Sequence, residues 1–304
     1  MNEKHSKYYN DTPEEAVKKL RAHDIIGKTV SLGIVIAIIF IICHIFLQIE
    51  HYDFFREEQN QPLLVLILLL YIVIMLVILI LYSKVVLPII GRYNSLQLEG
   101  VLFMDCDPIK MYDIYNLWEQ YDKKGKARNA FLLSKAQCCR FIPERMEEGM
   151  KYLSQVKLNK KQMHMESLRL LCVAAYARYK EDRAIFDKAK FEMEILCAKA
   201  RGKAMKQDYN RILQFINMYE LLWDEKDAQA RKLINHLLLN HNETRINKVR
   251  FHMNLALLDR KEKDYENAKL NLEYVVKFGN KLGIVPEAKE LLETCKNKLE
   301  GQFN

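Results

Sequence analysis

The side chains best able to do chemistry in this sequence are its eight histidines and seven cysteines. The cysteines are irregularly spaced and form no CxxC pair, so they predict neither a disulfide framework nor a thiolate zinc site. No HExxH motif, phosphate-binding glycine loop or GxSxG motif occurs in the sequence. We therefore expect a protein that is not an enzyme and that has no catalytic residues, cofactor or metal.

Two features allow narrower hypotheses. Cys138 and Cys139 are adjacent and could form a redox pair, but neighbours on a helix point about 100° apart, and small buried thiols are common in packed helices. His44 lies near the end of an apolar stretch, with no acidic residue in the next such stretch. We expect His44 to form a local hydrogen bond and not to carry a proton or a metal ion.

The elements that position these residues are predicted to be helices. Glycine and proline number only 10 and 6 in 304 residues, and they supply much of the turn chemistry that many short strands need. The sequence therefore predicts an all-α protein.

Two stretches, residues 29–47 and 62–82, contain no permanently charged side chain. At 1.5 Å per residue, each helix would reach about 30 Å, which is the thickness of the hydrocarbon layer of a bilayer. We predict a transmembrane hairpin over residues 29–91, with an outer loop at 48–61. No small-residue cleavage site follows the first stretch, so it is expected to stay as an anchor.

Basic residues near the ends of these stretches predict the orientation. The connecting loop has one basic residue, Arg56, and four acidic ones, whereas the flanking segments are basic. By the positive-inside rule, both termini of this integral membrane protein lie in the cytoplasm. The flanking basic residues are Lys18, Lys19, Arg21, Lys28, Lys84 and Arg92.

Residues 1–28 are predicted to form a cytoplasmic amphipathic segment. Asp11 or Thr12 can cap a helix, and Pro13 suits its first turn. We expect a short helix here that lies on the membrane surface.

Ser31, Gly33 and Ala37 give the first span a face of small residues. Helices in lipid associate through close packing, which small residues permit. We predict that this face packs against the second span. The same face could instead bind a second copy of the chain or another membrane protein.

A spacing recurs in the second part of the chain: a small residue, an apolar residue four positions later, and another three after that. Positions 0, 4 and 7 share one helix face. Each copy follows another amphipathic stretch, so the pattern predicts packed helix pairs. The copies are Gly149, Leu153 and Val156; Ala189, Met193 and Leu196; Ala230, Ile234 and Leu237; and Ala268, Leu272 and Val275. The preceding stretches are 126–141, 165–180, 207–223 and 245–260.

The last of these units, from Val249 to Asn280, resembles a tetratricopeptide repeat. Leu255 and Ala256 stand at the leucine and small-residue positions of the family's first helix, and KDYENA matches its turn and the entry to the second helix. The departures are His252, Asp259, Lys263 and Asn280, where the family prefers Trp, Tyr, Gly and Pro. The other units are longer than the family's repeat of about 34 residues.

This resemblance implies a cytoplasmic repeat domain over residues 92–304, built as a tetratricopeptide-like α-solenoid. Asp107 and Pro108 are predicted to start a helix near its beginning. Pro286 is predicted to open a capping helix at 286–299, with one polar side that closes the stack.

The expected function is that of a membrane-anchored scaffold or adaptor that binds a protein or peptide in a groove. The resemblance implies that the first helices line the concave surface, and on that basis the expected contact residues are Gln214, Asn217, Arg250 and Met253. The alternative is an accessory subunit of a membrane complex, with its essential contacts in the hairpin. The net charge of +8 is dispersed and not gathered into runs. Such a basic surface could hold an acidic peptide, lie near anionic lipid or contact nucleic acid, and nucleic acid is the least expected of these partners.

Overall fold

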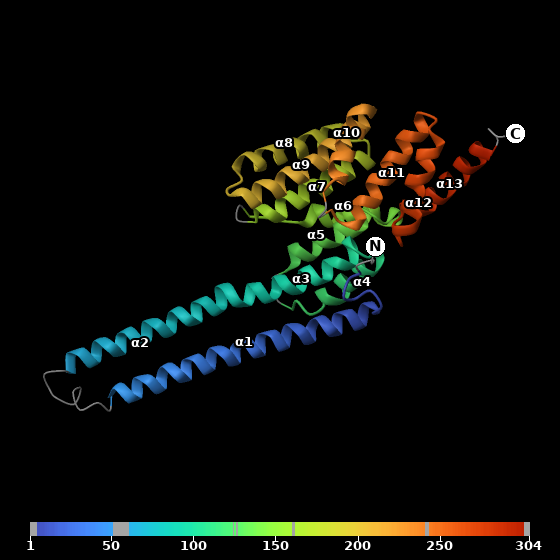
Figure 1. The fold of residues 1–304 in the computed structure, drawn as a ribbon. Helices are drawn as coiled ribbons and strands as arrows, with labels where there is room; N and C mark the ends of the chain where they lie inside the picture. Colours follow the sequence, from blue (N-terminus) through green and yellow to red (C-terminus); the bar gives the residue numbers. More distant parts are fainter. Residues whose placement is uncertain are drawn as a thin grey trace. The chain divides into compact units, whose positions relative to one another are not determined.

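The computed structural model describes residues 5–50, 61–123, 125, 127–159, 162–240 and 243–300. Within these ranges the chain is largely α-helical and contains no strand (Figure 1), which confirms the all-α prediction. The chain forms two compact units: the hairpin unit, Glu15–Gln97, and the array unit, which combines Met1–Glu14 with Leu98–Asn304. Residues 51–60, most of the predicted outer loop, lie outside the described ranges.

The first helix, α1 (Pro13–Glu50), is continuous over 38 residues. Its start agrees with the predicted cap. However, the short helix expected before the span is not a separate element, because it forms the first turns of α1. Gly27 is the one glycine in this part of the helix, and a single interior glycine costs only about 1 kcal/mol. The predicted domain limit at residues 28 and 29 therefore falls inside a helix.

The second long helical segment changes helix type once. α2 (Gln61–Leu81) runs into a π-helix at Tyr82–Val86, which is followed by α3 (Leu87–Phe103). Pro88 accounts for the change, because a proline ring clashes with the carbonyl four residues earlier in a regular α-helix. A π turn carries one extra residue and relieves that clash. The helical segment thus continues past the predicted limits at residues 82 and 91.

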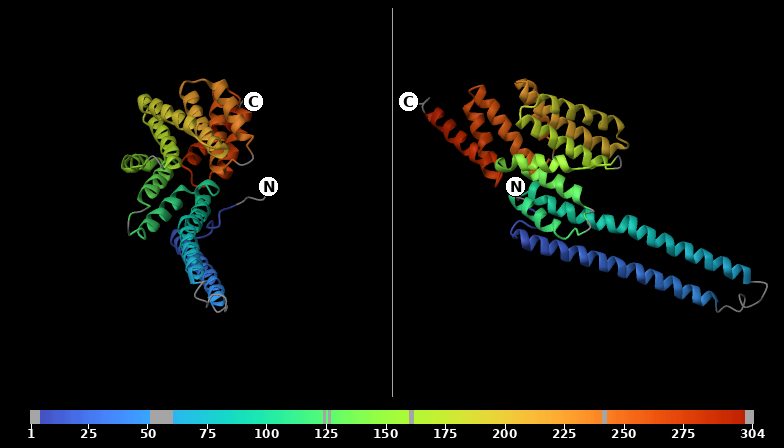
Figure 2. Two further views of the ribbon diagram at one scale, coloured as in Figure 1. Left: turned by 90° about the vertical axis from the view of Figure 1, so that its left-hand side faces the viewer. Right: turned by 180° about the vertical axis from the view of Figure 1, so that it is seen from behind.

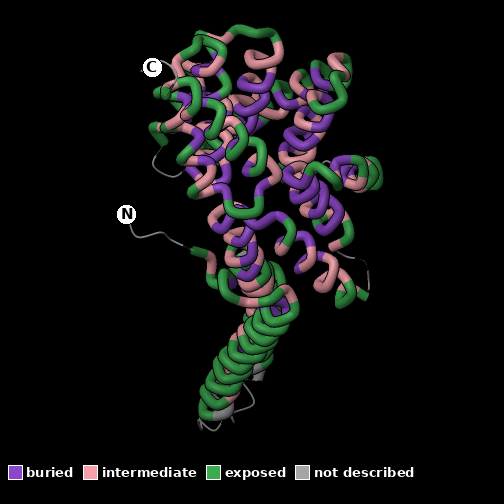
Figure 3. Tube along the Cα trace, turned by 90° about the vertical axis from the view of Figure 1, so that its right-hand side faces the viewer, coloured by how far each residue is buried: buried purple, intermediate pink, exposed green. Residues whose placement is uncertain are grey.

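Within the hairpin unit, α1 and α2 lie side by side (Figures 1 and 2). The sulfur of Cys43 and the hydroxyl oxygen of Tyr71 are 2.6 Å apart. The hydroxyl of Tyr82 donates to the carbonyl of Lys28 at 3.2 Å. From the first contact to the second, the residue number falls along α1, from 43 to 28, and rises along the second helical segment, from 71 to 82, so the two run antiparallel. Both are long and apolar enough to cross a membrane, and their apolar side chains are exposed along most of their length (Figure 3).

The predicted small-residue face does not coincide with the face of α1 that meets α2. The hydroxyl oxygen of Ser31 is 3.4 Å from that of Tyr82, and Val35 is buried. In contrast, a Cβ added at Gly33 would meet no atom within 4 Å, and Ala37 is exposed. Because a helix turns by about 100° per residue, Gly33 and Ala37 point away from the face that holds Ser31 and Val35, contrary to expectation.

The array unit contains ten further α-helices and a short 3-10 helix, Pro143–Arg145, within the described residues. The α-helices are α4 (Pro108–Glu119), α5 (Arg128–Cys139), α6 (Met146–Gln155), α7 (Met163–Tyr179), α8 (Arg183–Lys199), α9 (Lys203–Trp223), α10 (Asp227–Leu238), α11 (Arg245–Lys261), α12 (Tyr265–Phe278) and α13 (Ile284–Glu300). Asp107 caps α4 as expected, with its carboxylate accepting from the backbone N–H of Lys110 at 2.9 Å. Pro286 lies in the first turn of α13, which begins two residues before the predicted start.

The helices of the array unit pack in chain order, as pairs α5–α6, α7–α8, α9–α10 and α11–α12. First helices of successive pairs also contact each other, α5 with α7 and α7 with α9. Phe215 of α9 lies against Phe251 of α11, with ring centroids 5.9 Å apart. The four first helices therefore form a row in which each contacts the next.

The recurring small and apolar residues occupy the buried faces of the second helices. All four small residues are buried, and so are six of the eight apolar residues that follow them. Gly149 is the tightest case, because a Cβ there would lie 1.8 Å from the hydroxyl oxygen of Tyr176 and 2.8 Å from the Cβ of Cys139. The predicted spacing therefore identified the helix faces that build the core.

The first helices of three pairs end in the same type of turn. The backbone N–H groups of Asp182, Lys226 and Asp264 bond to carbonyls five residues earlier, and the preceding residue in each case has a positive φ. This is the Schellman pattern of helix termination. Lys263, with φ 62°, adopts the left-handed conformation that glycine adopts most easily.

The end of the array unit returns to its beginning. The amide nitrogen of the Asn280 side chain donates to the carbonyl of Asp105 at 2.8 Å, and the ammonium of Lys281 lies 3.0 Å from the carboxylate of Asp107. The N–H of Gly283 donates to the carbonyl of Phe141 at 3.1 Å. The loop between α12 and α13 is thereby fixed to loops that come more than a hundred residues earlier.

Candidate functional site

The row of first helices brings together four residues, which we call the arginine cluster: Arg140, Arg178, Tyr219 and Arg250. Arg140 directly follows α5, Arg178 lies in the last turn of α7, Tyr219 is on α9, and Arg250 is on α11. Three helices of the row thus contribute one member each, and the residue that follows α5 is the fourth.

Arg250 is the centre of this cluster. Its guanidinium donates to the hydroxyl of Tyr219, and its Cζ lies 5.4 Å from the ring centroids of both Tyr219 and Phe141. Arg178 lies 5.7 Å from the Tyr219 ring, and Arg140 lies 4.6 Å from the Phe141 ring. The two aromatic rings hold the three guanidinium groups through cation–π contacts, which leave the positive charges unneutralised.

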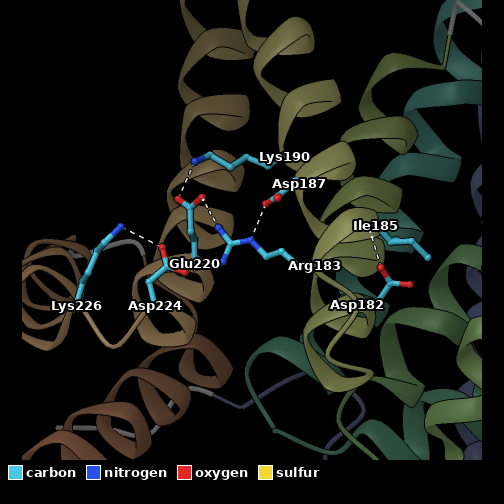
Figure 4. Close-up of polar contacts among 8 residues, drawn as sticks. All are labelled: Asp182, Arg183, Ile185, Asp187, Lys190, Glu220, Asp224 and Lys226. Carbon is cyan, nitrogen blue, oxygen red and sulfur yellow. Dashed lines mark hydrogen bonds and ion pairs between the residues drawn. The ribbon is translucent and has the colours of Figure 1, made fainter.

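No carboxylate pairs with Arg140, Arg178 or Arg250 in the described part of the chain. Several other arginines of the array unit are paired with carboxylates, among them Arg169, Arg211 and Arg231. Figure 4 shows Arg183 of α8 directed at Asp187 and Glu220, with Lys190 also on Glu220. In the arginine cluster, three half-buried arginines without carboxylate partners lie around two shared aromatic rings.

The hydrogen-bonding capacity of the cluster is also unfilled. The Nε and Nη1 atoms of Arg140 are buried and have no hydrogen-bond partner. Within the described residues, the hydroxyl of Tyr219 makes one hydrogen bond, the one that it accepts from Arg250. Since buried donors without partners cost about 1–3 kcal/mol each, a ligand with acceptor oxygens would be stabilised here.

The charges of the cluster change the acidity of its members. Burial of the Tyr219 hydroxyl opposes ionisation, but the charges of Arg250 and Arg140, together with the hydrogen bond from Arg250, lower its pKa below the ordinary value. The pKa of Arg178 is lowered by its own burial and by the charge of Arg250. The site therefore favours negative charge.

The sequence identified one member of this cluster. Arg250 was expected to contact a partner, and it lies at the centre. Gln214 and Asn217 are half-buried on the opposite side of α9 from Tyr219, as the 100° per residue of a helix requires, and Oδ1 of Asn217 is buried without a partner. Met253 is 4% exposed, so its side chain packs inside the array unit.

The other cluster members have a signal in the sequence that the choice of contact residues missed. Arg178 precedes the small residue Ala189 by eleven positions, and Tyr219 precedes Ala230 by the same interval. They are therefore equivalent residues of successive helix pairs. Aligning the pairs on their small residues would have placed Arg178 and Tyr219 on the same face.

A pocket of about 340 Å³ borders the cluster at Phe141. It lies between the loop that follows α5 and the loop between α12 and α13. Its walls are mixed in character, with apolar side chains, the basic residues Lys281 and Lys289, and the acidic Glu144. The apolar residues of the lining include Ile109, Ile142, Leu282 and Val285.

A second polar group joins α10, α11 and α12. The carboxylate of Asp259 accepts from Arg231 at 2.5 Å and from Asn271 at 2.8 Å. Nδ1 of His252 lies 2.7 Å from Oδ1 of the same Asn271, and its ring stacks on Tyr274. His252 and Asp259 are two of the departures from the tetratricopeptide pattern that the sequence analysis noted. In this structure both side chains contact the same residue, Asn271.

The residues with nucleophilic or metal-binding chemistry are not assembled into a site. All seven cysteines are free, and burial raises the pKa of Cys139 to about 12 and that of Cys138 well above its ordinary value. The two thiols therefore stay protonated, which does not favour the redox hypothesis. Among the described residues, no group of three or more His, Cys, Asp or Glu side chains could hold a metal ion. His44 is exposed on α1.

The chain matches no protein-family model, no curated protein and no solved structure.

Proposed function

We propose that this protein is a membrane-anchored, non-enzymatic interaction scaffold, whose tetratricopeptide-like helical repeats present a peptide-binding surface at the cytoplasmic face. The observation that carries this proposal is the arginine cluster. Three arginines without carboxylates come from helices that are equivalent in the repeat, which is the arrangement expected of a surface that is completed by a partner.

The hairpin unit supports the anchoring part of the proposal. The side chains of α1 and α2 that are exposed are mostly Ile, Leu and Val, and burial of such surface is favourable by about 25 cal/mol per Å². A bilayer would cover all of it at once. The excess of basic residues outside the loop between the spans supports the cytoplasmic position of both termini.

The repeat architecture is supported by the order of packing. A row of first helices, buried small residues on the second helices, and left-handed turns between them are features that tetratricopeptide-like solenoids share. In such a stack each pair cannot bury its apolar face alone, so the pairs create one extended surface. Arg250 lies on that surface.

Capture by the full-length chain tests the scaffold. The intact protein, Arg250→Glu and Arg201→Glu are each tagged, expressed in a membrane and extracted in mild detergent. Arg201 is exposed in the link between α8 and α9, so it controls for the charge change. We expect at least one polypeptide to be retained by the intact protein and by Arg201→Glu, and to be lost with Arg250→Glu. An unchanged set of retained polypeptides would reject this surface.

An accessory subunit of a membrane complex is the second candidate. It is favoured by Gly33 and Ala37, which face away from α2 and leave close-packing positions open on the outside of the hairpin. Replacing the hairpin by an unrelated two-span anchor separates the candidates. A scaffold keeps its retained polypeptides after the exchange, whereas a subunit loses them.

A further inference from the structure

We propose that the arginine cluster is a site for a phosphate monoester, and that its ligand is a phosphorylated side chain of the peptide partner. This inference rests on the proposed function and specifies the chemistry of the same surface. It is carried by the positions of Arg140, Arg178, Arg250 and Tyr219 and by their unfilled donors.

The charge of the cluster selects the charge of the ligand. Three guanidinium groups meet around two aromatic rings, and no carboxylate neutralises them in the described part of the chain. A carboxylate carries one negative charge, whereas a phosphate monoester carries about 1.5 to 2 at neutral pH and has three acceptor oxygens. The dianion matches the cluster better.

The donors of the cluster match the shape of the ligand. Arginine presents a planar fork that binds two oxygens of a phosphate at once. Arg140 has two buried nitrogens without a partner, and the hydroxyl of Tyr219 still has its own hydrogen to donate. Arg140 lies over the Phe141 ring, and Arg250 lies against the rings of both Phe141 and Tyr219, so these groups surround one guanidinium and suit one phosphate group.

The surroundings favour a peptide over a nucleic acid or a lipid. A nucleic acid needs a row of cations along its backbone, but two other arginines in the row of first helices, Arg169 and Arg211, are paired with carboxylates. The pocket that borders Phe141 has apolar walls together with two lysines and one acidic residue, Glu144. Such a pocket suits the side chains that flank a phosphorylated residue more than an acyl chain.

The first measurement uses small probes and the full-length chain in detergent. Calorimetric titration with phenyl phosphate is compared with benzoate, which has the same ring and a single charge. We expect phenyl phosphate to bind at least about tenfold more tightly at pH 8, because charge-assisted hydrogen bonds to three oxygens replace those to two. Equal binding of the two probes would overturn the inference.

Variants locate the probe. The double variant Arg178→Gln/Arg250→Gln is expected to weaken phenyl phosphate binding by about tenfold or more, since it removes two forks. Arg201→Gln is expected to keep the affinity of the intact chain. Equal weakening in both variants, or none in the double variant, would overturn the site.

A second readout uses the intact chain and no arginine variant, so its result does not depend on whether an arginine variant folds. Phenyl phosphate bound at the cluster offsets the charges that favour ionised Tyr219, so it should shift the ionisation of this residue to higher pH. The shift is read from tyrosinate absorbance, as the difference between the intact chain and Tyr219→Phe. No shift at saturating phenyl phosphate would overturn the inference.

The source of the phosphate is decided by competition. A phosphoserine peptide of mixed sequence, vesicles of phosphatidylcholine with phosphatidylinositol 4-phosphate, and a single-stranded oligonucleotide are each tested against phenyl phosphate. Displacement of phenyl phosphate by the peptide alone supports the inference. If the vesicles or the oligonucleotide displace phenyl phosphate and the peptide does not, the assignment to a peptide is overturned. Failure of all probes while Arg250→Glu still abolishes capture removes this inference and leaves the proposed function standing.

Discussion

The guanidinium of Arg250 donates to the hydroxyl of Tyr219 across the boundary between two helix pairs, and its Cζ lies 5.4 Å from the centroid of the same ring. Tyr219 is 3% exposed, so neither water nor a carboxylate shields it from the positive charge. One side chain thus joins α11 to α9 and also sets the acidity of a residue in the centre of the row.

The first prediction concerns the ionisation of Tyr219. Because its pKa is lowered in the folded protein, its contribution to stability is fully present above the ordinary tyrosine pKa of about 10 and is lost as the pH falls through the lowered folded value. The intact chain should therefore gain stability relative to Tyr219→Phe as the pH rises toward 10. Thermal denaturation of both proteins across this range measures the difference.

Arg178→Gln is the informative companion to that experiment. It keeps Tyr219 and its hydrogen bond from Arg250 but removes one of the charges that favour ionisation. The pH dependence should become shallower without disappearing. A pH-independent difference between the intact chain and Tyr219→Phe would contradict the prediction.

The second prediction tests the closest approach of two helices. Gly149→Ala places a methyl group 1.8 Å from the hydroxyl oxygen of Tyr176 and 2.8 Å from the Cβ of Cys139. Overpacking of a core costs about 1–3 kcal/mol, so the variant should unfold at a lower temperature. Gly33→Ala is the matched control, since a Cβ there meets nothing within 4 Å, and it should leave the midpoint unchanged or raise it slightly. Equal midpoints for Gly149→Ala and the intact chain would contradict the packing.

The third prediction compares two carboxylates that share one arginine. Arg231 contacts Asp259, whose side chain is 2% exposed, and Glu262, whose side chain is 55% exposed. Asp259→Ala should lower the free energy of unfolding by about 3 kcal/mol, because it breaks a buried ion pair and also removes the acceptor of Asn271. Glu262→Ala should cost less than about 1 kcal/mol, as is usual for exposed pairs. Chemical denaturation of both variants measures the two decreases in the free energy of unfolding. Similar decreases would show that burial does not determine how much each carboxylate contributes.

The fourth prediction is the inertness of the buried thiols. With the pKa of Cys106 and Cys139 raised by burial to about 12, about one molecule in ten thousand carries the reactive thiolate at pH 8. N-ethylmaleimide should therefore leave Cys106, Cys138, Cys139 and Cys172 unlabelled in the native chain and label all of them after denaturation. Mass spectrometry of peptides reads the result. Rapid native labelling of Cys138 or Cys139 would revive the redox hypothesis.

The sequence predicted the helices of the array unit well for a physical reason. A small residue followed by apolar residues at the fourth and seventh positions is amphipathic, so its phase fixes which face is buried. Ala230, Ile234 and Leu237 are all buried as expected. The cap at Asp107 and the helix start at Pro13 were predictable for a similar reason, because capping depends on neighbouring residues alone.

The sequence of the hairpin does not show which face of each helix is buried. Its residues are apolar all round, so the sequence could not decide whether Gly33 and Ala37 or Ser31 and Val35 would face α2. Helix continuity was also misjudged, since charge and composition change at residue 28 while helical propensity does not. The expected contact residues on α9, Gln214 and Asn217, lie about half a turn away from Tyr219, and their role in binding stays a prediction.

The return of Asn280 and Lys281 to Asp105 and Asp107 has a consequence for how this domain can change over evolution. An open stack can gain or lose a repeat at little cost, because only the adjacent surfaces must fit. Here an inserted or deleted pair would move the last loop away from its anchors, some 175 residues earlier in the chain. These contacts between the last loop and the first should therefore keep the number of repeats constant. Variation should be confined to side chains and to loops that do not make these contacts.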